Sequence, residues 1–256
     1  MRTPLVAGNW KMNTTIGGAV ALAGEVAAGV ERMAAVDVAV YPPFVALQAV
    51  ARALEGTRTS VGAQNMYFEE SGAFTGEVSP TMLDGVAASV IIGHSERRHI
   101  FGERDELVAR KVRSAFDHGL TPVFCVGEQL AERESGRTEG VVGRQVGFVV
   151  DQISPAEAAR MIIAYEPVWA IGTGVNATPD QAEDACAFIR GLIEGSFGEE
   201  AAGRARVLYG GSVNTGNWDE ITRRENVDGA LVGGASLDAP DFVRLVEITR
   251  DALAAD

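Results

Sequence analysis

The chain has 256 residues, with 46% hydrophobic and 22% charged residues, as is ordinary for a protein that buries a substantial core. Its formal net charge is −13 and its sequence pI is about 4.7, which argues against nucleic acid or an anionic membrane as a partner. The two cysteines, Cys125 and Cys186, have neither CxxC nor metal-site spacing. We therefore expect reduced thiols in a cytoplasmic protein.

Residues 16–30, IGGAVALAGEVAAGV, come nearest to a targeting segment. They are too short to span a bilayer, and Glu25 interrupts the apolar run. As a signal peptide they would follow Trp10 and Lys11, which is an atypical leader. We interpret them instead as the first helix, although residues 17–29 include four glycines.

Short apolar runs alternate with helical patterns along the whole chain, and their composition is typical of parallel strands covered on both faces. Two helix starts, SPAE (154–157) and TPDQ (178–181), combine an N-cap hydroxyl, a first-turn proline and a third-position Glu or Gln. The predicted strands are residues 5–10, 36–41, 59–64, 88–94, 121–127, 160–166, 206–211 and 228–234.

Eight strand–helix units in about 250 residues predict an α/β protein with one (β/α)₈ barrel, a TIM barrel, as a single domain over residues 1–256. The structural rival is a doubly wound open sheet, because GTGVNA (172–177) matches the GxGxxA phosphate fingerprint. That fingerprint lies directly between a strand and a helix. Here PVWAI intervenes and the helix begins only at TPDQ, so we interpret the match as accidental.

Residues 65–80, NMYFEESGAFTGEVSP, form one long connection without clear periodicity. Loops of this length in a compact domain are usually functional or disordered. The aromatic residues Tyr67, Phe68 and Phe74 argue against disorder.

Polar residues follow several predicted strands, at the end of the barrel where this architecture places its chemistry. Asn9 and Lys11 follow the first strand, residues 94–96 follow the fourth, and Glu166 ends the sixth. Lys11 and Lys111 are the only lysines among 22 basic residues. A compact ammonium is not interchangeable with a guanidinium in a tight site, so we favour a functional Lys11 over a surface ion pair and interpret Lys111 as structural.

His94 and Glu166 each have a structural alternative, as a satisfied histidine and as a partly buried ion-pair carboxylate. Ser95 has the chemistry of a helix N-cap, and a helix start beside the ring would keep the imidazole neutral. Beside a neutral imidazole, an ammonium and a glycine-bearing loop, Glu166 is best interpreted as a general base. No two histidines have metal-ligand spacing, so we expect no metal.

The turns YGGSVN (209–214) and VGGASL (232–237) follow the seventh and eighth strands. Glycine-rich turns before helix starts present backbone N–H groups to an anion, although they also arise for steric reasons. An acidic protein can still bind a phosphate there, because charges beyond a Debye length of about 8 Å are screened.

Six motifs resemble the triosephosphate isomerase family in order and spacing, over essentially the whole chain. The combination of GHSERR and EPVWAIGTG in one chain is very specific. The motifs are GNWKMN (8–13), GAFTGEVS (72–79), IIGHSERR (91–98), AYEPVWAIGTG (164–174), YGGSV (209–213) and GALVGGASL (229–237).

The resemblance implies a cofactor-independent isomerase of glycolysis and gluconeogenesis that interconverts dihydroxyacetone phosphate and D-glyceraldehyde 3-phosphate through an enediolate. It implies that Glu166 moves a proton between the two carbons. A neutral His94 would polarise the carbonyl and shuttle protons between the oxygens. Lys11 and Asn9 would contact those oxygens, and Glu96 would act in support.

For the phosphate, the resemblance implies backbone contacts from Gly172, Ser212, Gly233 and Gly234. It also implies that PVWAIGT (167–173) is a mobile lid whose closure excludes water from the reaction.

The long loop resembles the segment by which each subunit of the family enters its twofold partner. This implies a homodimer whose contacts include Thr75, Glu77 and Arg97, with Thr75 directed at the partner's Asn9 and Lys11. The chain departs from the family pattern at Tyr41, where a small residue is more usual, and in the glycines of residues 17–29.

Two alternatives remain: a different phosphate-binding barrel enzyme, such as an aldolase, a synthase or a metal-dependent sugar isomerase, and a non-catalytic barrel that serves as a structural or interaction protein. A Schiff-base aldolase of this architecture needs a lysine on a barrel strand, whereas the sixth strand ends in Glu166. A metal-dependent sugar isomerase needs a cluster of carboxylates and histidines, and the sequence shows no such cluster. A non-catalytic barrel would be expected to lose Lys11, His94 or Glu166, whereas this sequence has all three.

Overall fold

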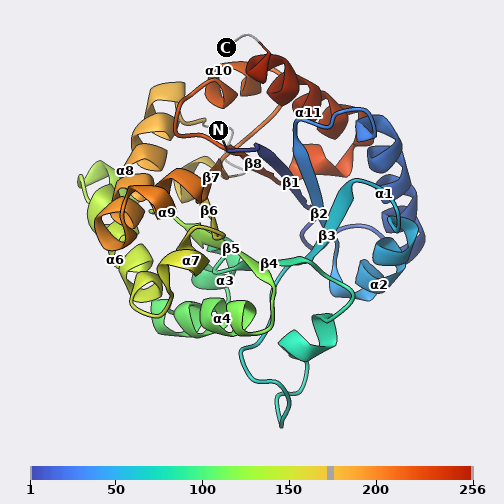
Figure 1. Ribbon diagram of the computed structural model, residues 1–256, viewed down its shortest axis with the longest axis horizontal. Helices are drawn as coiled ribbons and strands as arrows, with labels where there is room; N and C mark the ends of the chain where they lie inside the picture. The colour runs from blue at the N-terminus through green and yellow to red at the C-terminus, as the bar shows by residue number, and fades with distance from the viewer. Residues whose placement is uncertain (1, 172–175, 255–256) are drawn as a thin grey trace.

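The computed structural model describes residues 2–171 and 176–254. Eight parallel strands pair in chain order and the last strand pairs with the first, so the sheet closes into a barrel surrounded by helices (Figure 1). The predicted (β/α)₈ barrel is confirmed, and each predicted strand is present. The strands are β1 (Leu5–Asn9), β2 (Asp37–Tyr41), β3 (Thr59–Ala63), β4 (Ser89–Ile92), β5 (Thr121–Val126), β6 (Ile162–Tyr165), β7 (Arg206–Tyr209) and β8 (Gly229–Val232).

The helices lie outside the barrel, and local capping decides where several of them begin. Both predicted starts are confirmed, because Ser154 and Thr178 each form a complete capping box. The helices are α1 (Ile16–Val30), α2 (Phe44–Ala53), α3 (Ser95–His99), α4 (Asp105–Asp117), α5 (Leu130–Glu134), α6 (Thr138–Val150), α7 (Pro155–Ala158), α8 (Pro179–Phe197), α9 (Glu199–Arg204), α10 (Trp218–Thr222) and α11 (Ala239–Leu253), with 3₁₀ helices η1 (Pro80–Leu83), η2 (Val168–Ala170) and η3 (Gly234–Leu237).

The glycine-rich stretch forms the regular helix α1, which packs against α2 and α11. The glycine at position 29 has a steric explanation, since a Cβ there would lie 2.5 Å from Cγ2 of Val243 on α11. Glycine therefore lets the two helices approach closely. Among the helices described, none combines the length and the apolar composition that a bilayer crossing requires.

Tyr41, the unusual residue at the end of β2, is fully buried inside the barrel. Its hydroxyl lies 2.8 Å from Oγ of Ser89, and burial raises its pKa to about 12. A Cβ on Gly62 of β3 would lie 2.1 Å from Cε1 of Tyr41. The missing side chain at Gly62 therefore provides the space that the phenol ring fills.

The long connection between β3 and η1 projects away from the barrel (Figure 1). The Tyr67 ring packs against Phe68 and Phe74, with centroids 4.3 and 4.5 Å away. The backbone N–H of Tyr67 donates to the carbonyl of Val78 at 2.8 Å, which ties the two ends of the loop together. These contacts give the loop the internal order that its aromatic residues predicted.

Candidate active site

A cavity of about 490 Å³ opens at the carboxyl ends of the strands, a size typical of small-molecule sites. It brings together four predicted catalytic residues from three strand ends, and three of the four predicted phosphate contacts. Gly172 lies outside the described residues. The predicted residues that line the cavity are Asn9, Lys11, His94, Glu166, Ser212, Gly233 and Gly234.

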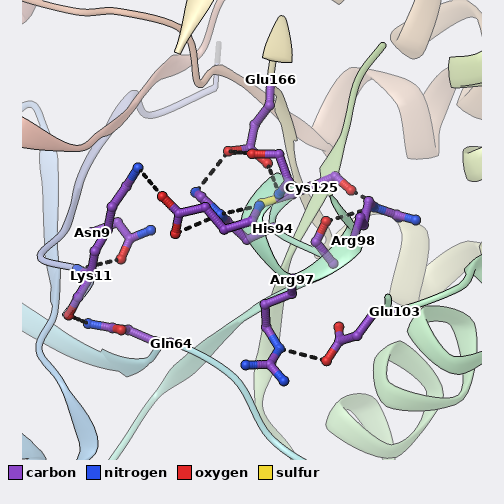
Figure 2. Close-up of polar contacts among 12 residues, drawn as sticks. Asn9, Lys11, Gln64, His94, Arg97, Arg98, Glu103, Cys125 and Glu166 are labelled. Carbon is purple, nitrogen blue, oxygen red and sulfur yellow. Dashed lines mark hydrogen bonds and ion pairs between the residues drawn. The ribbon is translucent and has the colours of Figure 1, made fainter. Parts of the chain in front are cut away.

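Glu166 is buried directly after β6, and its backbone N–H donates to the carbonyl of Val126 at 2.7 Å. Its carboxylate points toward His94 (Figure 2). Oε1 lies 2.9 Å from Nε2 of His94, and Oε2 accepts from the backbone N–H of Ser95 at 2.8 Å. Both carboxylate oxygens are therefore held by residues that follow β4.

The contact between Glu166 and His94 shifts the pKa of each group. Burial alone raises the pKa of Glu166, but the contacts with His94 and Ser95 outweigh it and hold that pKa below 4.5. Burial alone lowers the pKa of His94, but Glu166 and Glu96 outweigh it and raise that pKa above 6.5. While Glu166 and His94 are in contact, the carboxylate and the imidazolium stabilise each other's charged form. The neutral imidazole therefore stays a prediction for the state in which Glu166 has left His94.

The prediction that Ser95 is the N-cap of the next helix is wrong. His94 occupies the N-cap of α3, and its Nδ1 accepts from the backbone N–H of Glu96 at 3.3 Å. Ser95 is the first helical residue, because its N–H and its hydroxyl both face Glu166 instead. Only the neutral ring, with its proton on Nε2, can accept this hydrogen bond at Nδ1, and the charged ring would lose it.

Lys11 follows β1 with a φ of 52°, an unusual conformation for a residue other than glycine. The Oδ1 of Asn9 accepts from its N–H at 3.0 Å, and the amide of Gln64 donates to its carbonyl at 2.8 Å. Its ammonium lies 2.6 Å from Oε1 of Glu96, which does not line the cavity. Three polar side chains thus hold Lys11 in a strained conformation at the cavity.

The glycine-rich turns after β7 and β8 form the opposite wall of the cavity. A Cβ on Gly233 would lie 3.5 Å from Cε and 3.8 Å from Nζ of Lys11, so this turn approaches the ammonium closely. The amide of Asn217 donates to the carbonyl of Ser212 at 2.9 Å and thereby fixes the turn after β7. An anion between the two turns would face backbone N–H groups and one positive charge.

The three predicted dimer residues lie outside this cavity. Thr75 and Glu77 are exposed in the long loop. Arg97, on α3, donates from Nε to Glu103 at 2.6 Å, and its guanidinium lies 5.1 Å from the ring centre of Phe101.

Glu128, which directly follows the loop residue Gly127 after β5, is a buried carboxylate that the sequence reasoning missed. It accepts hydrogen bonds from Tyr165 at 3.1 Å, from Trp169 at 2.9 Å and from Arg133 at 3.1 Å. The rule that identified Glu166, a carboxylate near the end of an apolar strand, could also have identified Glu128. It anchors the beginning of the segment after β6.

Lys111 is buried in an ion pair with Glu103 at 2.5 Å, and its ammonium donates to Oδ1 of Asn65 at 2.8 Å, which agrees with its structural interpretation. Both cysteines are buried and free. Within residues 2–171 and 176–254, no group of three or more His, Cys, Asp or Glu side chains could hold a metal ion.

Comparison with known proteins identifies the family. The triosephosphate isomerase family model matches residues 4–249. A triosephosphate isomerase of Carboxydothermus hydrogenoformans is 51% identical over 248 residues, which is 96% of this chain and 99% of the relative. One of Clostridium novyi is 50% identical over 251 residues, 98% and 100% of the two chains. One of Syntrophotalea carbinolica is 48% identical over 248 residues, 96% and 98%. With its barrel and the residues gathered at one mouth, the chain belongs to the triosephosphate isomerase family.

Proposed function

We propose that this chain interconverts dihydroxyacetone phosphate and D-glyceraldehyde 3-phosphate by proton transfer through an enediolate, a step of glycolysis and gluconeogenesis. The observation that carries the proposal is the convergence of Asn9, Lys11, His94 and Glu166 on one cavity beside two glycine-rich turns. A carboxylate, an imidazole and an ammonium suffice for proton transfer next to a carbonyl, and none of them requires a cofactor.

Glu166 is the base in this proposal, and it acts after leaving its contacts with His94 and Ser95. Those contacts lower its pKa, whereas burial raises it. When the carboxylate turns toward the substrate carbon, burial remains and the stabilising hydrogen bonds are lost. The pKa of the carboxyl group then rises, and it becomes a stronger base at the moment of proton abstraction.

His94 is the electrophile that polarises the carbonyl and passes protons between the two substrate oxygens. Its Nδ1 accepts from the N–H of Glu96, which supports a ring that offers its Nε2 proton to the cavity. Departure of Glu166 removes the main contact that raises the pKa of the ring, so the neutral imidazole becomes favoured. Lys11 and Asn9 stabilise the negative charge on the enediolate, and Glu96 supports Lys11.

The phosphate binds between the turns after β7 and β8, through Ser212, Gly233 and Gly234, with Gly172 contributed by the lid. The close approach of Gly233 to the ammonium of Lys11 supports this position for a dianion.

Residues 167–173 act as the lid over the substrate. Trp169 donates to the buried Glu128 at 2.9 Å, and the guanidinium of Arg133 lies 4.7 Å from the centre of its ring. These contacts give the first part of the lid a defined resting position, from which closure would remove water from Glu166.

A coupled assay tests the proposed activity directly. Purified protein is given D-glyceraldehyde 3-phosphate, and the appearance of dihydroxyacetone phosphate is followed by its reduction with NADH and a dehydrogenase. The wild-type protein is expected to turn over the substrate, and the Glu166→Gln and His94→Gln variants are each expected to lose this activity. A non-catalytic barrel would show no turnover, and another phosphate-binding enzyme would convert neither triose phosphate.

We infer that the chain acts as a homodimer in the cytoplasm. The connections after β1 to β4 are neighbours around the barrel, and they expose large apolar side chains. The long loop that carries Thr75 is the connection after β3. Cys125 and Cys186 are buried and free, as expected for a cytoplasmic protein. The large apolar residues exposed after β1 to β4 are Met12, Ile16, Phe44, Val45, Phe74, Met82, Ile100 and Phe101, and Leu130 after β5 is exposed as well.

Sedimentation velocity tests the dimer. Wild type is expected at the dimer mass and Thr75→Arg at the monomer mass, with reduced activity because Lys11 and Asn9 lose the partner's loop. Gly203→Arg is the control, since α9 is distant from the loop and a side chain at Gly203 meets open space. A dimeric and active Thr75→Arg variant would reject the loop as the interface.

A further inference from the structure

Gln145 on α6 is buried at 4% exposure, and no role at the cavity follows from its position in the sequence. Its Oε1 accepts from the backbone N–H of Gly127 at 2.8 Å, and its Nε2 donates to the carbonyl of the same residue at 3.2 Å. One side-chain amide thus pairs with both polar backbone groups of a single residue. A planar amide is suited to this, because it presents a donor and an acceptor side by side.

Gly127 lies just beyond β5 and directly against the backbone of Glu166. A Cβ on Gly127 would lie 1.8 Å from the carbonyl oxygen of Glu166, so only glycine permits this approach. Hydrogen bonds flank the contact on both sides. Glu166 donates to Val126 at 2.7 Å, and Val168 donates to Glu128 at 3.1 Å.

We propose that Gln145 is a positioning residue for the general base, because it fixes the backbone of Gly127 against which Glu166 is placed. This inference rests on the proposed function of Glu166. The same segment carries Glu128, which accepts a hydrogen bond from Trp169 at 2.9 Å, so Gln145 also supports the position of Trp169. Gln145 does not line the cavity, and both hydrogen bonds of its side-chain amide are made to Gly127.

The proposal has a physical basis in the burial of the Gly127 hydrogen bonds. Without the amide of Gln145, a buried N–H and a buried C=O lose their partners, and such groups are costly to leave unsatisfied. The segment 126–128 then moves toward water and carries the paired segment 166–168 with it. A displacement of about 1 Å at a catalytic group can reduce turnover on the order of a hundredfold.

The test compares Gln145→Met, which keeps the length of the side chain and removes both hydrogen bonds, with Val149→Ala. Val149 is buried on the same face of α6 one turn away, and it serves as the control for lost core packing. For Gln145→Met, kcat is expected to fall at least about tenfold, with the KM and the inhibition constant of inorganic phosphate within about twofold of wild type. The primary deuterium isotope effect on proton abstraction is expected to rise, since a displaced base slows that step selectively. Val149→Ala should change none of these values.

Amide hydrogen exchange gives a readout that does not depend on activity. The N–H groups of Gly127 and Glu166 are expected to exchange faster in Gln145→Met than in wild type and in Val149→Ala. Gln145→Asn, one methylene shorter, should shift both readouts in the same direction and replaces Gln145→Met if the latter does not fold. Wild-type kcat together with wild-type protection at Glu166 in these variants would overturn the role of Gln145. An inactive wild type would instead reject the proposed function, and the exchange data would still decide whether Gln145 holds the backbone of Glu166.

Discussion

Nε2 of His94 lies 2.9 Å from Oε1 of Glu166, so the imidazole and the carboxylate that follow β4 and β6 share one buried contact (Figure 2). Ser95 holds the other carboxylate oxygen at 2.8 Å. The proposed base therefore has two defined partners before any substrate binds. Its reach to the substrate carbon depends on the length of the Glu166 side chain.

Glu166→Asp shortens that reach and is expected to lower kcat on the order of a hundredfold, since misplacement by about 1 Å has this effect. KM should change much less, because the phosphate contacts are made elsewhere. Steady-state kinetics in the coupled assay measures both constants. Glu194→Asp, an exposed substitution on α8, is the matched control. Wild-type turnover in Glu166→Asp would exclude this residue as the base.

Lys11→Arg should leave the fold intact and remove most of the activity. The ammonium lies 2.6 Å from Glu96 and close to Gly233, where a bulkier planar guanidinium would enter the phosphate position. The loss is expected in both kcat and KM, because Lys11 is proposed to face the enediolate and the phosphate. Circular dichroism checks the fold, and Arg32→Lys, exposed after α1, is the reciprocal control. A fully active Lys11→Arg enzyme would remove the ammonium from the mechanism.

The barrel and the main site residues could be predicted from the sequence because their signals are local. An apolar run of strand length identifies each strand, and the strand order of a closed parallel barrel places the residues after β1, β4 and β6 around one mouth. The start of α8 at Thr178 was predictable for the same reason, since Gln181 completes the capping box within one turn.

The details that were missed depend on partners distant in sequence. Ser95 has the chemistry of an N-cap, but Glu166, 71 residues away, accepts from its N–H and leaves the cap to His94. The two hydrogen bonds between Gln145 and Gly127 exist only because α6 packs behind β5. The unusual size of Tyr41 has its explanation in Gly62 on the next strand.

Tyr41 and Gly62 are expected to be energetically coupled. A Cβ on Gly62 would lie 2.1 Å from the Tyr41 ring and 2.6 Å from Oγ of Ser89, so Gly62→Ala should destabilise the protein by about 3 kcal/mol. Tyr41→Ala should cost about 3–5 kcal/mol through the cavity it leaves. In the double variant the new methyl group enters the vacated space. The loss in the free energy of unfolding should therefore be at least about 1 kcal/mol smaller than the sum of the losses in the two single variants.

Urea unfolding of the four proteins measures this coupling as a double-mutant cycle. Gly24→Ala is the control for the glycine substitution, because its Cβ meets open space on α1 and alanine favours a helix. Strictly additive losses for Tyr41 and Gly62 would show that the two residues do not compete for the same space.

Glu157 gives a pH-dependent stability that can be assigned to one carboxylate. Hydrogen bonds from Arg113 lower its pKa from 4.5 to about 2, with burial opposing the shift and Ser154 contributing to it. Arg113 on α4 contacts both carboxylate oxygens, and Ser154 donates its N–H at 2.8 Å. The folded state therefore binds fewer protons at this site than the unfolded chain. The stabilisation is complete above a pH of about 4.5 and is lost as the pH falls toward about 2.

Glu157→Gln is accordingly expected to be less stable than wild type by about 1 kcal/mol at neutral pH, a value reduced by solvent screening of this partly exposed pair. The difference in the free energy of unfolding between Glu157→Gln and wild type should narrow as the pH falls from about 4.5 toward 2. The wild-type carboxylate becomes protonated in this range and loses its attraction to Arg113. Urea unfolding of both proteins at several pH values measures the difference. Glu31→Gln, an exposed change at the end of α1, should show no comparable narrowing. A difference between Glu157→Gln and wild type that stays constant across this range would mean that Arg113 does not stabilise the ionised carboxylate, and that Ser154 and the helix start alone account for the role of Glu157.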